Sequence, residues 1–190
     1  MQHRARFEIW GGENELIFVN DGSTDASMNI LEVIAQQNKN VRVISFSRNF
    51  GHEAAMIAGI DHAAGDVIIC MDADLQHPLE CIAPIMAKFE EGYEVISMVR
   101  TSNKSAGAIK NFTSRAFYRV INALSDQVKL EENASDFFAI SSRVADVLRT
   151  NYREKTRFLR GYVQSVGFRK TTLEYTAAER AGGASHHTLK

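Results

Sequence analysis

Short apolar runs alternate with helical patterns between residues 15 and 100, and this rhythm constrains the fold more than any other feature. The expected order is strand 16–19, helix 24–37, strand 41–46, helix 53–64, strand 67–71, helix 78–91 and strand 95–99. A β-α-β-α order of this kind favours a mostly parallel sheet with right-handed crossovers and flanking helices. A hairpin at Asn20-Asp21-Gly22 is the alternative. We reject it because a helical pattern follows that turn instead of a strand.

The rhythm changes after residue 100. A continuous apolar stripe predicts an amphipathic helix over 109–124. Weaker patterns predict the remaining elements: a short strand at 137–140, helices at 142–150 and 155–165, and a final strand at 166–175. We expect one α/β domain over residues 1–190, with an atypical segment at 1–14 and a Gly-containing tail at 176–190.

Composition excludes several other classes of protein. The 190 residues are 45% hydrophobic and 24% charged, which is typical of a globular domain with its own core. The net charge of −1 gives no bulk signal for nucleic acid binding. Two cysteines, Cys70 and Cys81, are too few for a disulfide framework, and Cys70 is expected in the core. No run reaches the ~18 apolar residues that span a bilayer, and the first residues lack the apolar core of a signal peptide.

Asp72 and Asp74 form the most specific candidate site in the sequence. They follow a buried apolar strand, and residues two apart in extended chain project to the same side. Ligands of open parallel sheets bind beyond the carboxyl ends of the strands. Mg²⁺ and Mn²⁺ prefer oxygen ligands and commonly bind one or two carboxylates together with substrate phosphates. We therefore favour a metal site here over a solvated loop that happens to carry two acids.

Four stretches resemble the motifs of glycosyltransferase family 2: VNDGSTD at 19–25, SRNFGHEAAMIAGIDHAAGDVI at 47–68, DADLQHP at 72–78 and ENASDF at 132–137. The subgroup that they resemble most is the polyprenyl-phosphate glycosyltransferases, such as bactoprenol glucosyltransferases and dolichol-phosphate mannose synthases. The resemblance runs in order from about residue 15 to residue 190. It implies a GT-A fold with a Rossmann-like sheet. It also implies an inverting enzyme that passes a sugar from a UDP- or GDP-linked donor to a polyprenyl phosphate at the cytoplasmic face of a membrane.

The resemblance also assigns residues to the donor side of the site. It places Asp21, with Gly22 and Ser23, beside the nucleoside part of the donor. The metal, Mg²⁺ or Mn²⁺, would be held by Asp72, Asp74 and Gln76 and would neutralise the leaving nucleoside diphosphate. Arg100, at the end of a predicted strand, is the basic residue expected near the donor.

The resemblance names Asp136 and Asp74 as the catalytic carboxylates. Family members often carry Gly before the first of these and Arg two places after it, where this chain has Ser135 and Phe138. A phosphate monoester is already mostly a dianion at neutral pH because its second pKa is near ~6. Asp136 therefore has two open roles, as a base or as an orienting charge, and capping of a turn is the structural alternative.

Four residues are expected to bind the acceptor phosphate: Arg115, Arg180, Ser185 and His186. The last three belong to a tail that resembles the acceptor loop of the family. Arg115 lies one turn from Arg119, so the two also fit an ordinary solvated helix face. Residues 143–170 hold eight Lys/Arg against two acids, which suits either anionic lipid headgroups or a solubilising surface.

Two alternatives remain open from the sequence. One is a glycosyltransferase of the same fold with a saccharide acceptor, for which Asp136 must act as a true base. The other is a truncated relative that binds nucleotide without turnover. Relatives begin with an additional apolar strand, expected in the centre of the sheet beside the strand that ends at Asp21. Without it we expect an open strand edge, through which copies of the chain could associate.

Overall fold

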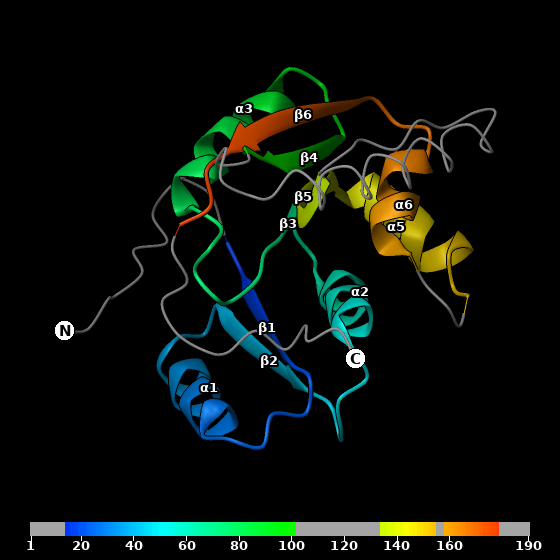
Figure 1. Ribbon diagram of the computed structural model, residues 1–190. Helices are drawn as coiled ribbons and strands as arrows, with labels where there is room; N and C mark the ends of the chain where they lie inside the picture. The colour runs from blue at the N-terminus through cyan, green and yellow to red at the C-terminus, as the bar shows by residue number, and fades with distance from the viewer. Residues whose placement is uncertain (1–13, 102–133, 155–157, 179–190) are drawn as a thin grey trace, which may run out of the picture.

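The computed structural model describes residues 14–101, 134–154 and 158–178 (Figure 1). Its elements are β1 (Leu16–Asn20), α1 (Ser27–Gln37), β2 (Val41–Ser45), α2 (His52–His62), β3 (Val67–Cys70), the 3₁₀ turn η1 (Leu79–Cys81), α3 (Ile82–Glu90), β4 (Val95–Arg100), β5 (Ala134–Ser141), α5 (Ser142–Asn151), α6 (Leu159–Ser165) and β6 (Lys170–Tyr175). Each lies within a few residues of an element expected from the sequence. The helix expected over 109–124 falls outside the described residues.

The described strands form two sheets. β1 and β2 pair in parallel, while the second sheet has the order β3-β5-β4-β6. In Figure 1 the β1–β2 sheet and α1 form the lower part of the molecule, and the four-stranded sheet forms the upper part. The α/β class is therefore confirmed.

The expectation of a mostly parallel sheet is wrong for the larger sheet. β4 and β6 are parallel, but β5 runs antiparallel to both β3 and β4. The expectation rested on the β-α rhythm, which ends at β4, and crossover rules apply only to strands joined as βαβ units. β5 lies beyond that rhythm, so its direction depended on tertiary packing.

Both faces of the four-stranded sheet are covered. Phe137 and Ala139 of β5 pack against Ile85 of α3, while Phe138 and Ile140 face the other side. On that second side, residues of α2, α5 and α6 form the covering layer. Neighbouring strand residues point to opposite faces, so a strand buried on both faces must be apolar throughout. Cys70 packs against this second cluster, as expected for a core residue.

Helix α2 joins the two sheets, and polar contacts tie it to α5. Arg149 donates to the carbonyl oxygens of Ile60 and Ala63, where α2 ends. Arg153 pairs with Asp61 at 2.9 Å. Last-turn carbonyls of a helix have no partner within the helix, so a guanidinium there satisfies them. Helix α5 and the residues just after it thus hold the C-terminal end of α2 in place.

β1 pairs with β2 alone, and β3 with β5 alone, among the strands of the described ranges. Each therefore has one edge with no described strand beside it. The additional central strand expected beside β1 stays a prediction, as does the boundary of a single domain over residues 1–190.

Candidate active site

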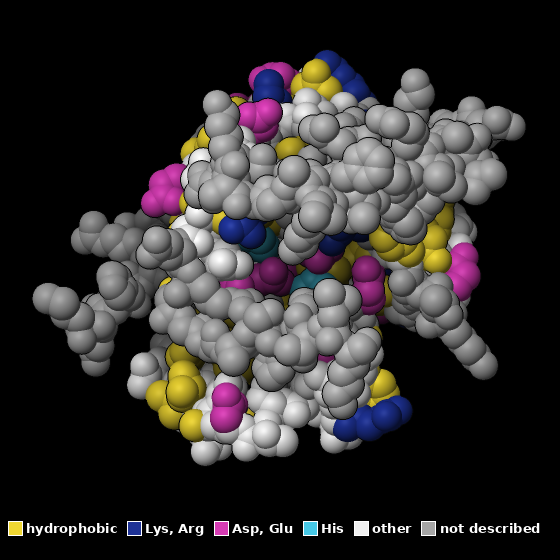
Figure 2. Space-filling model, viewed as in Figure 1, with side chains coloured by type: hydrophobic (Ala, Val, Ile, Leu, Met, Phe, Trp, Pro, Cys, Tyr) yellow, Lys and Arg dark blue, Asp and Glu magenta, His cyan; other side chains and the backbone are white. Residues whose placement is uncertain are grey.

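The end of β3 and the start of β5 lie side by side in the middle of the molecule. In the β3–β5 ladder Ile69 pairs with Ala139 and Cys70 with Phe138. Continuing this antiparallel register by two residues sets Asp72 opposite Asp136. Figure 2 shows acidic, basic and histidine side chains gathered in a hollow between the upper and lower parts of the molecule. The reversed direction of β5 is what brings its beginning to the edge where β3 ends.

The turn after β1 is built by Asn20 and Gly22. Asn20 is buried, and its side-chain oxygen accepts from the Ser23 amide at 3.1 Å while its amide donates to Ser45. Gly22 has φ +68°, and a Cβ there would lie 2.6 Å from the Asn49 backbone nitrogen. Only glycine fits both the left-handed backbone and this close approach.

Asp21 reaches across to the loop that precedes α2. Its Oδ1 accepts from the Phe50 amide at 2.7 Å, and its Oδ2 accepts from the Gly51 amide at 2.9 Å. A carboxylate has about four lone-pair sites, so both oxygens keep capacity for a ligand. In this structure Asp21 fixes the entry to α2, and the donor-binding role expected for it stays a prediction.

His52, the first residue of α2, lies between two carboxylates. Its Nε2 is 3.5 Å from Asp136 Oδ2 and 3.7 Å from Asp72 Oδ1, and about half of its side chain is exposed. The contact with Asp136 raises the pKa of His52, and the charges of Asp72 and Glu53 act in the same direction. Partial burial opposes the shift without cancelling it.

Asp136 is held by Arg160 as well as by His52. Arg160 of α6 donates to Asp136 Oδ1 from Nε at 3.1 Å and from Nη2 at 2.6 Å. Burial alone would raise the pKa of this carboxyl, but the hydrogen bonds from His52 and Arg160 outweigh it and lower the pKa to about 2. Asp136 is therefore an ion-paired carboxylate at any physiological pH.

His77 supports the turn that carries Asp72. It is buried, and its Nδ1 accepts from the Asp72 amide at 3.0 Å. Its ring stacks on Phe137, with 4.7 Å between centroids, and meets Tyr175 edge-on. Burial lowers the pKa of His77, which keeps the ring neutral and able to accept that bond.

The loop between Asp72 and His77 presents the metal candidates. Asp74 Oδ1 accepts from the Gln76 amide at 3.0 Å, and the exposed Leu75 between them has φ +63°. No group of three or more His, Cys, Asp or Glu side chains able to hold a metal occurs within the described ranges. A pair of carboxylates nevertheless fits Mg²⁺ or Mn²⁺, because such ions commonly complete their shell with water and substrate phosphate.

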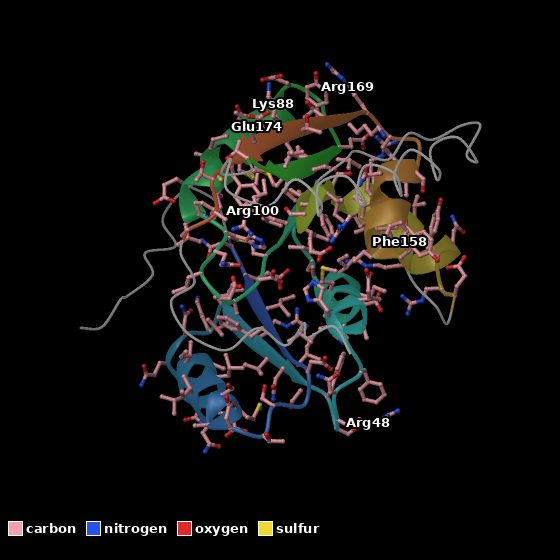
Figure 3. The ribbon with its side chains drawn as sticks, viewed as in Figure 1. Arg48, Lys88, Arg100, Phe158, Arg169 and Glu174 are labelled. Atoms are coloured by element: carbon pink, nitrogen blue, oxygen red, sulfur yellow. The ribbon has the colours of Figure 1, made fainter. Side chains whose placement is uncertain are left out.

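Arg100 ends β4 near this cluster. Figure 3 shows its side chain towards the middle of the molecule, whereas Arg169 lies at the periphery. The positive charge of Arg100 adds to the effect of burial in lowering the pKa of His77. Arg100 is thus close enough to His77 for its charge to act on that ring.

Several expected residues are outside the described part of the chain: Arg115, Arg119, Arg180, Ser185 and His186. The basic segment is described except at residues 155–157. Its six described cations contact protein groups: Arg143 meets Glu94, Arg149 meets Asp146 and Ile60, Arg153 meets Asp61, Arg160 meets Asp136, Arg169 meets Glu91 and Lys170 meets Gln164. The interpretation of this segment as a lipid-facing surface gains no support from these contacts.

Sequence reasoning did not single out His52, His77 or Arg160. His52 could have been considered, because it begins the helix that follows β2, and ligands of such sheets bind beyond strand ends. Arg160 left no local signal. Its helix is brought to Asp136 by packing of the apolar residues Leu159 and Val163 and by the hydrogen bond from the Leu159 amide to Glu53.

The fold is that of the GT-A glycosyltransferases. Two solved structures share the fold. S. aureus TarS 1–349 is 16% identical, with a TM-score of 0.55, and the match covers 86% of this chain and 50% of that chain. A Pyrobaculum calidifontis mannosyltransferase in complex with GDP-Man and Mn²⁺ is 16% identical, with a TM-score of 0.56, and the match covers 88% of this chain and 48% of that chain. The profile of glycosyl transferase family 2 matches residues 5–149, and the chain belongs to this family.

Curated relatives are similar over most of the chain. An uncharacterized glycosyltransferase, YkcC of Bacillus subtilis, is 42% identical over 93% of this chain and 54% of its own length. A bactoprenol glucosyl transferase of Shigella phage SfV is 38% identical over 91% and 56%. The chain thus spans about half the length of these relatives. None of the helices that the structure describes is both long and apolar enough to cross a membrane.

Proposed function

We propose that this chain is the catalytic part of a metal-dependent glycosyltransferase that moves a sugar from a nucleoside-diphosphate donor to a polyprenyl phosphate. The relatives named bactoprenol glucosyl transferase support this acceptor class and suggest glucose as the first sugar to test. The reaction would take place at the cytoplasmic face of a membrane, where a polyprenyl phosphate presents its headgroup.

The state of Asp136 carries the proposal. A saccharide hydroxyl needs a base to remove its proton, and an efficient base has a pKa near the working pH. The pKa of Asp136 is lowered to about 2 by its hydrogen bonds to His52 and Arg160, despite burial. Such a group is a poor base. A phosphate dianion needs no deprotonation, so the site suits a phosphate acceptor better than a hydroxyl.

The reaction is one displacement. A phosphate oxygen of the lipid forms a bond to the anomeric carbon of the sugar, and the bond from that carbon to the donor diphosphate breaks. The electron pair of the broken bond leaves with the nucleoside diphosphate, and no covalent enzyme intermediate forms. The attacking phosphate must approach a site that holds several carboxylates, so Arg160, His52 and Arg100 offset that negative charge.

Asp72 and Asp74, with Gln76 nearby, are the proposed metal-binding residues. A bound Mg²⁺ or Mn²⁺ would stabilise negative charge on the leaving diphosphate. The backbone of the turn is fixed by His77 and by the Asp74–Gln76 contact, so the carboxylates are preorganised for that task.

The acceptor class is tested with a pair of lipids that differ in one group. The purified chain is incubated with Mn²⁺, UDP-glucose or GDP-mannose, and either undecaprenyl phosphate or undecaprenol in detergent. We expect transfer to the phosphate only, and loss of transfer when EDTA is added. Equal transfer to the alcohol, or transfer to a free saccharide in its place, would instead support the saccharide-acceptor alternative.

The donor side is tested by binding. Thermal shift with UDP- and GDP-sugars, with and without Mn²⁺ or Mg²⁺, should show stabilisation by one nucleotide only when metal is present. Asp72→Asn and Asp74→Asn should abolish that shift without lowering the basal melting temperature. Asp66→Asn, at the opposite end of β3, is the matched control. A nucleotide shift without any transfer in the lipid assay would favour the non-catalytic alternative.

A further inference from the structure

Two like charges lie close to the end of the β3–β5 ladder: Asp72 follows β3 by two residues, and Asp136 is in β5. Asp72 and Asp136 face one another when the β3–β5 register is continued. Both carboxylates lie near His52 of α2, and Asp72 Oδ2 also lies 3.9 Å from Nε2 of the buried His77. Like charges held close together repel each other. A positive or hydrogen-bonding group is needed to keep Asp72 and Asp136 close to each other.

His52 occupies the position between them. Its Nε2 is within 3.7 Å of Asp72 Oδ1 and within 3.5 Å of Asp136 Oδ2. One ring nitrogen therefore faces both carboxylates, and it lies slightly nearer to Asp136 than to Asp72.

The backbone at His52 is itself fixed from two directions. Asp21 accepts from the amides of Phe50 and Gly51 just before it. Glu53, just after it, accepts from the Leu159 amide at the start of α6 at 2.9 Å. The first turn of α2 is thus tied to the β1 turn and to the helix that carries Arg160.

Arg160 completes the hold on Asp136 by binding the other oxygen, Oδ1. The carboxylate is therefore held between α6 on one side and α2 on the other. From this arrangement we infer that His52 is a positioning residue, which keeps the carboxylates of Asp72 and Asp136 at a fixed separation and orientation. This inference rests on the proposed function for the reaction that it serves.

The first test measures the contact without any substrate. Unfolding in urea is compared for the parent chain, His52→Leu, Asp136→Asn and the double variant. We expect the two changes to be coupled by about threefold or more in the unfolding equilibrium constant, since interacting neighbours are non-additive. His62→Leu, at the other end of the same helix, should show no coupling with Asp136→Asn.

The second test separates positioning from proton transfer. His52→Leu should lower kcat for transfer from UDP-glucose to undecaprenyl phosphate by about tenfold or more, with the donor KM changed by less than about twofold. His52→Gln keeps an N–H donor but cannot shuttle a proton in the manner of imidazole. It should restore kcat to within about threefold of the parent.

The outcomes are distinguishable. Additive effects of His52→Leu and Asp136→Asn on unfolding overturn the inference, whatever the activity. Coupling without rescue by His52→Gln in an active parent overturns it too, because the imidazole is then needed for more than a contact. An inactive parent overturns the proposed function, and the positioning role is then decided by the unfolding coupling alone.

Discussion

The β1–α1–β2 region and the four-stranded sheet differ sharply in how much they bury. Helix α1 has no buried residue, and Ile30, Val33 and Ile34 on it are exposed. In the larger sheet, by contrast, Ile96, Phe137 and their neighbours are fully buried between helices. Among the described residues of the first region only Asn20 and Val41 are buried, whereas the second has apolar clusters on both faces of its sheet.

The candidate site lies where these two regions meet. Its β1 side supplies Asp21 from a turn held by hydrogen bonds, while Asp136 comes from a strand inside the packed sheet. Elements with little buried surface open more readily than core strands. The β5 side of the site is therefore held by packing, whereas the β1 side depends on a few specific contacts.

The largest expected effect comes from the packed sheet. Ile140→Ala removes a fully buried side chain of β5 and should cost about 2–5 kcal/mol in the free energy of unfolding. Ile30→Ala, at a residue that is 58% exposed on α1, should change it by less than about 0.5 kcal/mol. Urea unfolding of both variants checks this. Equal costs would show that the two regions do not differ in how much their burial contributes to stability.

The turn after β1 should be as sensitive as a core position, but for another reason. Gly22→Ala brings a Cβ against the backbone of Arg48 and Asn49 at a left-handed φ, and should cost about 1–3 kcal/mol. Gly51→Ala is the control, since its φ of +98° is also positive but nothing lies within 4 Å of the added Cβ. Unfolding free energies separate the clash from the backbone strain. If Gly22→Ala costs no more than Gly51→Ala, the close approach of residue 22 to Arg48 and Asn49 does not contribute to stability.

Acid should weaken the contacts of Asp136 over a defined pH range. The folded pKa of Asp136 is about 2, because hydrogen bonds from His52 and Arg160 outweigh its burial, whereas the ordinary value is 3.8. Since the folded value is the lower one, the carboxylate adds about 2 kcal/mol of stability above the ordinary value, which is lost as pH falls through 2.

Unfolding of the parent and of Asp136→Asn between pH 6 and pH 2 measures this contribution. The difference between the two proteins should be largest at pH 6 and should shrink as the pH falls. Asp66→Asn, at an exposed residue, serves as the control. A difference that stays constant over the whole range would contradict the prediction.

The smallest effect concerns the join between α2 and α5. Arg149→Met removes the hydrogen bonds to the carbonyls of Ile60 and Ala63 and should cost about 1 kcal/mol. Arg143→Met, at a side chain that is 74% exposed and paired with Glu94, should cost less than about 0.5 kcal/mol. Thermal unfolding of both variants compares them. Equal values would mean that Arg149 does not hold α2 in place.

The sequence by itself determined the elements and half of the site. Hydrophobic periodicity and turn residues are local, so they located nearly every described strand and helix. The rule that ligands bind beyond strand ends singled out Asp21, Asp72 and Arg100, which all lie at the ends of described strands or directly after them.

Only the tertiary structure decided how those pieces meet. The antiparallel direction of β5 sets Asp136 opposite Asp72, and packing of α2 and α6 brings His52 and Arg160 to them. Strand direction, register and helix placement depend on contacts between residues far apart in the chain. No local pattern encodes such contacts, because their free energy arises only when both partners are already folded against the same core.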